Sequence, residues 1–257
     1  MTIRYGVKAG VARLQIDRPE RRNALDAAMR VELADQVERA AADPEVRAVV
    51  LAGVPGHFCS GADLGQFAGE TLASSRLRMR RGGLKIIDGL TRMEKPVIAS
   101  VDGPAVGLGW ALALACDHVV VSTRARFALT YAKVGLVPDC GAAHMLVRNI
   151  GMLRAKELIF SGRFVDASEA LAMGLATEIV DEDKVESHVE AVAQRFAAGP
   201  TFAYGMSKHM LHQALSPSLG DFFDIEALVA PQMRFTEDYR EGTTAFREKR
   251  PPNFKGN

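Results

Sequence analysis

The amino-acid sequence predicts an α/β fold in which a sheet-forming core is followed by a purely helical C-terminal region. Short apolar segments with strand character alternate with helical segments up to about residue 181, and from Asp183 onward only helical patterns remain. Hydrophobic residues make up 48% and charged residues 25% of the 257 residues, which excludes wholesale disorder. A chain of this length can build one large core with a smaller appendage.

The first half of the chain is expected to alternate between strands and helices. Short apolar or alternating runs predict strands over residues 11–16, 48–52 and 97–101. Asp26 is a good N-cap for a helix that runs to about Ala41, because apolar residues recur on one face of that segment. A second helix is predicted over residues 71–92, and Pro96 would stop it.

The second half is expected to continue this alternation before it becomes helical. A glycine-rich turn that feeds an apolar helix is predicted over residues 102–117, and a buried strand over 118–122. Asp166 and Glu169 have the spacing of a capping box and predict a short helix. A last strand is expected over residues 176–180. The helices that follow are expected to be divided by three prolines, Pro200, Pro217 and Pro231.

The overall charge and the cysteine content exclude several classes of protein. Lys and Arg total 32 and Asp and Glu total 31, a net charge of +1, whereas nucleic-acid-binding proteins normally show a basic excess. Three cysteines without a CxxC pair favour neither a disulfide framework nor a zinc site. The longest uncharged stretch, residues 103–116, is too short to span a membrane. We therefore expect a soluble cytoplasmic protein that binds neither nucleic acid nor membranes.

Two glycine-rich segments, residues 57–64 and 102–117, are candidates for binding an anion or a developing oxyanion. In each segment glycines precede or open an expected helix, where unpaired backbone N–H groups meet the positive end of the helix dipole. The spacing of Gly103, Gly107 and Gly109 does not match a dinucleotide fingerprint. Tight strand-to-helix turns are the alternative explanation for these glycines.

The motifs in these two segments, together with four others, resemble the enoyl-CoA hydratase/isomerase family, also called the crotonase superfamily. The six segments follow the order typical of the family and cover nearly the whole chain: RPERRNAL (18–25), HFCSGADL (57–64), KPVIASVDGPAVGLGWALALACD (95–117), RFALTYAKVGLVPDCGAAHML (126–146), SGRFVDASEALAMGLATEIV (161–180) and AFREKRPPNFKGN (245–257). The resemblance implies a crotonase-type spiral of β-β-α turns over residues 1–195, which binds acyl-CoA, and a helical trimerisation region over 196–257. It also implies a homotrimer or homohexamer and no metal or cofactor beyond the coenzyme A of the substrate.

The resemblance further assigns roles to individual residues. The backbone N–H groups of Ala62 and Leu108 would form an oxyanion hole for the thioester carbonyl. Ala62, Asp63, Leu64 and Gly65 would run along the pantetheine arm of the acyl-CoA, and Arg21, Arg22 and Ala24 would lie near its nucleotide end. Phe246 and Lys249 would cover the adenine, either of the same chain or of a neighbouring subunit. Simple solvation is the alternative explanation for the charged members of this set. Trp110 would line the site or be buried in the core.

The residues that move protons differ from those of family hydratases, which carry two glutamates. The corresponding positions here are Ala111 and Tyr131; alanine cannot titrate, and tyrosine, with an ordinary pKa of about 10, is a poor base at neutral pH. Asp139 remains, at a position where several family isomerases carry a catalytic acid. A single carboxylate suffices to remove a proton alpha to the thioester and return it at the gamma carbon. Tyr131 would donate a hydrogen bond, shape the acyl pocket or pack in the core.

The sequence therefore predicts an acyl-CoA enzyme, with double-bond isomerisation preferred and enoyl-CoA hydration as the alternative. A helix N-cap is the competing structural explanation for Asp139. A thioesterase with Ser60, His57 and Asp139 is a weaker alternative, because no G-x-S-x-G elbow is present. A non-catalytic acyl-CoA-binding protein would also account for the missing glutamates.

Overall fold

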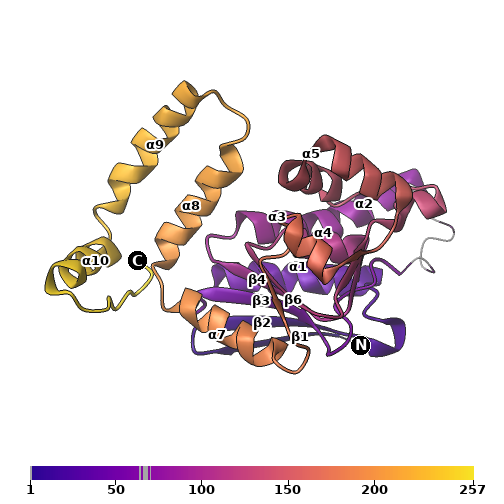
Figure 1. Cartoon of the computed structure of the whole chain (residues 1–257), viewed down its shortest axis with the longest axis horizontal. Coiled ribbons are helices and arrows are strands. Elements are labelled where there is room, and N and C mark those ends of the chain that lie inside the picture. Colours follow the sequence, from indigo (N-terminus) through magenta and orange to yellow (C-terminus); the bar gives the residue numbers. More distant parts are fainter. Residues whose placement is uncertain (1, 64, 66–68, 70) are drawn as a thin grey trace.

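A computed structural model of the chain confirms the α/β core and the helical C-terminal region (Figure 1). The structure describes residues 2–63, 65, 69 and 71–257. In Figure 1 the strands lie in the middle of the core with helices on either side of them, whereas three C-terminal helices project away from the core. The core therefore holds the two glycine-rich segments, and the projecting helices form a separate arm.

The main sheet has six strands in the order β1-β2-β3-β4-β6-β9. The strands are β1 (Thr2–Lys8), β2 (Val11–Asp17), β3 (Ala48–Gly53), β4 (Val97–Val101), β6 (His118–Ser122) and β9 (Glu178–Val180). β1 and β2 form an antiparallel hairpin, and every later pair in this sheet is parallel. β1 was missing from the sequence prediction, although Ile3, Tyr5 and Val7 alternate in the pattern of a half-buried strand.

A second, smaller sheet lies beside the glycine-rich segments. It has three strands in the order β5-β7-β8, which are β5 (Pro104–Val106), β7 (Arg126–Ala128) and β8 (Val165–Asp166). β5 pairs with β7 in parallel, and β7 pairs with β8 in antiparallel orientation. Because β5 belongs to the second glycine-rich segment, this sheet fixes the position of that segment.

Both faces of the main sheet are buried. Along β3, Val49 and Leu51 belong to the larger hydrophobic cluster, which includes Leu33 of α1 (Ala27–Ala42). The intervening Val50 belongs to a second cluster together with Val189 of α7 (Val185–Ala197). Burial on both faces explains why the strand sequences are continuous apolar runs and show little alternation.

Two predicted helix N-caps are confirmed. The Asp26 side chain accepts a hydrogen bond from the Met29 backbone N–H at 2.9 Å at the start of α1. The Asp166 side chain accepts one from the Glu169 N–H at 2.8 Å at the start of α6 (Ala167–Ala172). Each cap satisfies one of the N–H groups that a helix leaves unpaired in its first turn.

The predicted single helix over residues 71–92 is wrong, because the structure has two helices there. α2 (Leu72–Arg81) and α3 (Gly83–Arg92) meet at Gly82, whose φ of −108° and ψ of −102° lie outside the helical region. The two consecutive glycines, Gly82 and Gly83, make this break inexpensive. The break lets α3 turn towards α4 (Leu108–Leu114) and contact it.

The C-terminal arm consists of α8 (Thr201–Gln213), α9 (Leu219–Met233) and α10 (Glu237–Glu248). Pro200 and Pro217 precede α8 and α9, as predicted. The prediction that Pro231 separates two helices is wrong, because Pro231 lies within the last turn of α9. A proline there costs only one backbone hydrogen bond near the helix end. No helix in the described part of the chain is long and apolar enough to span a membrane.

The C-terminal tail docks against α10 through two carboxylates. Asp238 accepts hydrogen bonds from the backbone N–H groups of Lys255 at 2.6 Å and Gly256 at 2.8 Å. Glu241 accepts from Arg250 Nη1 at 2.6 Å and from the Asn253 N–H at 2.7 Å. The Arg250 hydrogen bond, followed by that of Asn253, lowers the pKa of Glu241 to about 2.

Acidification should release the part of the tail that Glu241 holds. A carboxyl group with a depressed pKa stabilises the docked state above its ordinary pKa, and this contribution is lost as the pH falls towards the depressed value. The protection factor of the Asn253 amide, which is the exchange rate of an unstructured peptide at the same pH divided by the measured rate, should therefore fall between a pH of about 4.5 and about 2. Amide exchange measured across this range tests the prediction, with Glu241→Gln as the comparison. Equal protection of the Asn253 amide in both proteins at neutral pH would contradict it.

Candidate active site

The two glycine-rich segments lie side by side and are joined by backbone hydrogen bonds. The Cys59 N–H donates to the Pro104 carbonyl at 3.1 Å, and the Val106 N–H donates to the Cys59 carbonyl at 2.9 Å. A Cβ atom added to Gly109 would clash with the Cys59 carbonyl oxygen, and one added to Gly103 would clash with that of Gly56. The glycines therefore allow two backbone segments to approach more closely than any other residue would permit.

The backbone N–H of Ala62 is unoccupied and directed away from its neighbouring segment. Leu25 and Ala62 form a parallel bridge, in which the Leu25 N–H donates to the Gly61 carbonyl at 2.8 Å and the Asp63 N–H donates to the Leu25 carbonyl at 3.0 Å. In such a bridge the hydrogen bonds use the residues that flank Ala62, so its own N–H points away from Leu25. No hydrogen-bond partner for this N–H exists among the described residues.

The backbone N–H of Leu108 is the second unoccupied donor. Leu108 is the first residue of α4, where an N–H has no partner within the helix. The described part of the chain offers it no other acceptor. A Cβ atom on Gly61 would lie 3.8 Å from the Leu108 nitrogen, which places the Ala62 and Leu108 segments in contact. Two N–H donors that have no partner in the described part of the chain thus lie on adjoining segments, one of them at the start of a short helix.

A tyrosine and an aspartate lie next to this turn. The Tyr131 hydroxyl oxygen is 3.7 Å from the position of a Cβ atom on Gly107, the residue before Leu108. Tyr131 belongs to a 3₁₀ turn over Thr130–Val134 and donates a hydrogen bond from its hydroxyl to Asp139 Oδ1 at 2.8 Å. The Tyr131 hydroxyl therefore lies between the Asp139 carboxylate and the turn that precedes Leu108.

The groups that surround Asp139 remain protonated at neutral pH. Burial, and then the Asp139 charge, raise the pKa of Tyr131 well above its ordinary value. The same two causes raise the pKa of the Cys140 thiol to about 12. Tyr131 therefore serves as a hydrogen-bond donor and is excluded as a base. Of the three positions Ala111, Tyr131 and Asp139, only Asp139 carries a carboxyl group.

The N-cap explanation for Asp139 is wrong. α5 (Ala142–Ser161) is preceded by Gly141, and no side chain caps its start. The Asp139 side chain contacts Tyr131, and only its backbone carbonyl accepts from the Ala142 N–H, at 3.0 Å. Cys140 and Gly141 follow with φ values of 49° and 74°, two consecutive left-handed residues that turn the chain between Asp139 and α5.

The thioesterase triad is not assembled. The Ser60 hydroxyl donates to the Arg21 carbonyl at 3.3 Å, and Asp139 is paired with Tyr131. Within the described residues no hydrogen bond joins Ser60 to His57, whose Nδ1 is buried without a partner. Ala111, one of the two positions where the family resemblance leads us to expect a glutamate in hydratases, is fully buried in α4.

The remaining predicted binding residues fall into two groups. Near the glycine-rich segments, Arg21, Arg22 and Gly65 are exposed and Ala24 is half-buried, whereas Leu64 lies outside the described residues. Asp63 is engaged by Arg18 at 2.9 Å. Trp110 is completely buried, with its ring 5.4 Å from that of Phe127, so the structure places it in the core.

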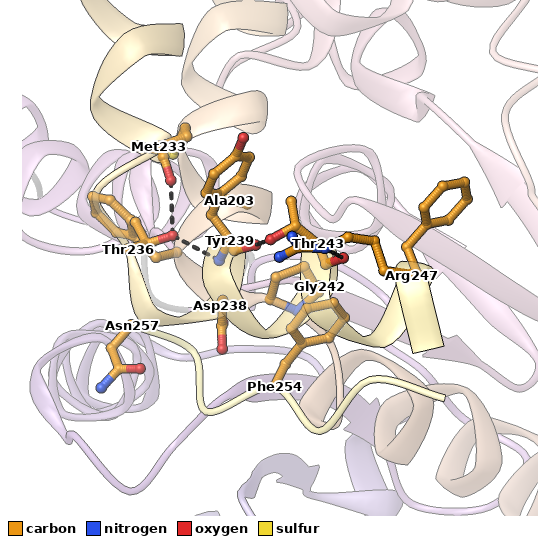
Figure 2. Close-up of a pocket in the computed structure, with 13 residues that line it drawn as sticks. Ala203, Met233, Thr236, Asp238, Tyr239, Gly242, Thr243, Arg247, Phe254 and Asn257 are labelled. Carbon is orange, nitrogen blue, oxygen red and sulfur yellow. Dashed lines mark hydrogen bonds between the residues drawn. The ribbon is translucent and has the colours of Figure 1, made fainter. Parts of the chain in front are cut away.

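Phe246 and Lys249 lie on the C-terminal arm, away from the glycine-rich segments of the same chain (Figure 1). Phe246 is 85% exposed and borders an apolar cavity of about 550 Å³ between α8, α10 and the tail. Figure 2 shows how Met233, Tyr239 and Phe254 surround this cavity. Lys249 ends α10 in a left-handed conformation, with a φ of 54°.

The sequence analysis missed Arg18 and Asn23, which hold the first glycine-rich segment in place. Arg18 is 7% and Asn23 0% exposed. Both belong to the polar RPERRNAL segment, where the sequence pattern favours a solvated loop. No local signal distinguishes a buried arginine from an exposed one, because its partners come from a segment about 40 residues further along the chain.

Comparisons with known proteins match the chain to one family over nearly its whole length. The model of the family described as enoyl-CoA hydratase/isomerase matches residues 6–257. A protein of Rhodobacter capsulatus named "Probable enoyl-CoA hydratase" is 40% identical over 99% of this chain and 98% of its own length. The 1,2-epoxyphenylacetyl-CoA isomerase of Escherichia coli is 32% identical over 97% of both chains.

Solved structures share the whole fold. The crystal structure of an enoyl-CoA hydratase from Polaromonas sp. JS666 matches with a TM-score of 0.94 and 29% identity, over 99% of this chain and 100% of that chain. The enoyl-CoA hydratase of Bacillus anthracis matches with a TM-score of 0.93 and 30% identity, over 99% of each chain. The predicted fold class, with its C-terminal helices, is thereby confirmed.

Proposed function

Because the chain belongs to the enoyl-CoA hydratase/isomerase family, we propose that it is an enoyl-CoA isomerase that interconverts β,γ- and α,β-unsaturated acyl-CoA thioesters. The observation that carries this proposal is the contact of Asp139 with Tyr131 beside the Gly107–Leu108 turn. It supplies one carboxylate next to two free backbone donors. One positioned carboxylate is enough for double-bond migration, whereas the hydratases of the family are expected to use two glutamates.

The Ala62 and Leu108 N–H groups would bind the thioester oxygen. When a proton leaves the alpha carbon, negative charge moves onto this oxygen, and donors that are already in position stabilise it. Losing one donor of this kind typically costs about 2.7–4 kcal/mol of transition-state stabilisation. The absence of internal partners for both groups in the described residues supports this role, since the donors are available to a substrate.

Asp139 would carry the proton from one carbon to the other. Its carboxylate removes a proton from the alpha carbon of the β,γ-enoyl thioester, and the electron pair delocalises into a dienolate. The protonated Asp139 then returns the proton to the gamma carbon, and the double bond shifts to the α,β position. Tyr131 donates its hydrogen bond to Asp139 Oδ1 and so holds the carboxylate in one orientation.

We also propose that the coenzyme A portion lies along Arg21, Arg22, Ala24 and residues 62–65. Phe246 and Lys249 would cover the adenine from another copy of the chain, because the C-terminal arm lies away from the glycine-rich segments of its own chain (Figure 1). This arrangement would require the trimer or hexamer expected from the sequence. We propose no metal and no separate cofactor for the reaction.

Enoyl-CoA hydration is the second candidate, and the names of relatives favour it. Besides the Rhodobacter protein, the 2,3-dehydroadipyl-CoA hydratase of Escherichia coli is 33% identical over 95% of this chain. A hydratase would have to activate water with Asp139 alone, because Ala111 and Tyr131 offer no second base.

An assay of the wild-type protein distinguishes these functions. Incubating it with β,γ-enoyl-CoA of several chain lengths should increase the absorbance of the conjugated thioester. In deuterated water the alpha and gamma carbons should be labelled to the extent that the proton on Asp139 exchanges with solvent before it is returned. Loss of absorbance from α,β-enoyl-CoA, with formation of 3-hydroxyacyl-CoA, would identify a hydratase. Release of free thiol would indicate a thioesterase. Tight binding without any turnover would contradict every enzymatic assignment and leave an acyl-CoA-binding protein.

A further inference from the structure

A buried ion pair holds the residue that follows the first oxyanion donor. Arg18 Nη1 donates to Asp63 Oδ2 at 2.9 Å and to the Ala24 carbonyl at 3.0 Å. The Arg18 side chain is 8% and the Asp63 side chain 21% exposed. A guanidinium group presents several N–H donors in a fixed plane, so it can hold two acceptors in one geometry.

Asn23 holds the beginning of the same segment. Its Oδ1 accepts a hydrogen bond from the Arg18 backbone N–H at 2.8 Å, and its Nδ2 donates to the carbonyls of His57 at 2.6 Å and Phe58 at 3.2 Å. Arg18 and Asn23 therefore contact both ends of the segment that contains Ala62. Both are buried, so solvent does not compete for these hydrogen bonds.

Hydrogen bonds to the Leu25 backbone fix the chain on both sides of Ala62. The Gly61 carbonyl accepts from Leu25, and the Asp63 N–H donates to Leu25. Arg18 binds the Asp63 side chain and the Ala24 carbonyl at the same time, so it ties the two strands of this bridge together. A rotation of the peptide group between Gly61 and Ala62 would break the hydrogen bond from the Leu25 N–H to the Gly61 carbonyl, and Arg18 holds the two segments in the register that this hydrogen bond needs.

We propose that Arg18 is a positioning residue for the reaction, which acts through Asp63 to fix the direction of the Ala62 N–H. This inference rests on the proposed function, because it requires the Ala62 N–H to be an oxyanion donor. It also gives the Asp63 side chain a role within the protein, so only the backbone at this position remains to contact the substrate.

The substitutions Arg18→Met and Arg18→Lys test the inference by kinetics. Arg18→Met should lower kcat by about 10²-fold, the loss expected when one oxyanion donor is misdirected, with little change in KM. Arg18→Lys should fall between this variant and the wild type, because an ammonium group reproduces the charge but not the planar geometry. Asp63→Asn, which preserves the side-chain volume, provides a second probe if Arg18→Met fails to fold.

Lys208→Met is the matched control for loss of a buried cation. Lys208 lies in α8, its side chain is also 8% exposed, and it pairs with Asp117 at 2.8 Å and with the Leu90 carbonyl, not with the segment that contains Ala62. The Lys208→Met substitution should lower the melting temperature and leave kcat unchanged. If Lys208→Met and Arg18→Met lowered kcat equally at matched stability, a general loss of stability would explain both, and the positioning role would be excluded.

Infrared spectroscopy of a bound thioester separates this inference from the proposed function. The probe is butyryl-CoA with a ¹³C label at the thioester carbonyl, which binds without reacting. In the wild type the carbonyl stretch should move to lower frequency on binding, and in Arg18→Met much of this shift should be lost. A full shift in Arg18→Met would overturn the positioning role. Absence of a shift in the wild type would overturn the oxyanion hole, and with it the proposed function.

Discussion

Replacing Asp139 with asparagine should lower kcat for double-bond isomerisation by about 10²- to 10⁴-fold, the usual contribution of a positioned acid or base. Asparagine has nearly the same shape and still accepts a hydrogen bond from Tyr131, but it cannot take up a proton at neutral pH. Substrate affinity should change little, because the oxyanion donors are backbone groups. Steady-state kinetics with a β,γ-enoyl-CoA, together with a binding titration, measures both quantities.

Tyr131→Phe is the control for this experiment. It retains the carboxylate and removes only the hydrogen bond to Oδ1, so its loss of kcat should be smaller than that of Asp139→Asn. Deuterium incorporation at the alpha carbon should disappear in Asp139→Asn and persist in Tyr131→Phe. Undiminished isomerisation by Asp139→Asn would show that another group moves the proton.

Replacing Gly109 with alanine should have the second largest effect. The added methyl group would clash with the Cys59 carbonyl, which also accepts the hydrogen bond from Val106. To relieve this clash the two glycine-rich segments have to move apart. This movement displaces the Leu108 N–H relative to the Ala62 N–H. We expect the free energy of unfolding to fall by about 1–3 kcal/mol. We also expect kcat to fall by about 10²-fold, since a small misplacement of reacting groups has this effect.

Gly6→Ala provides the comparison for the glycine substitution. No heavy atom lies within 4 Å of a Cβ atom at Gly6, which belongs to the edge strand β1. This variant should retain wild-type stability and kcat. Denaturant unfolding and steady-state kinetics of both variants give the required values. A Gly109→Ala protein with unaltered stability and kcat would show that the two segments are not in the close contact described here.

The fold was predictable where local pattern and tertiary structure agree. The Asp26 cap, the apolar strand at Ala48–Gly53 and the helical C-terminal region follow from short-range signals. The helical Pro231, which is exposed, did not follow because a proline locates a helix boundary only approximately. The break at Gly82 did not follow because it also depends on what packs against that position. At Gly82, for example, a Cβ atom would lie 3.0 Å from that of Arg30 in α1.

The segments that supply the backbone groups of the candidate site could be predicted from the sequence. Most of the contacts between its side chains could not. Ala62, Leu108 and Asp139 came from motifs that resemble a family, and the structure brings their segments together. The pairing of Tyr131 with Asp139, and of Arg18 with Asp63, could not be derived from sequence. A side-chain pair depends on rotamers and on long-range register, which no single segment determines.

The two unoccupied amides are supplied by the main chain, and Asp139 is supplied by a segment more than 30 residues later. If the proposed function holds, substitutions at positions 111, 131 and 139 exchange one acid–base arrangement for another without altering the two amides proposed to bind the thioester oxygen. Conversely, no substitution of the Ala62 or Leu108 side chain by another residue with an N–H can delete either donor. A fold that binds the thioester through main-chain amides therefore accommodates a change of the reaction more readily than replacement of the thioester by another group.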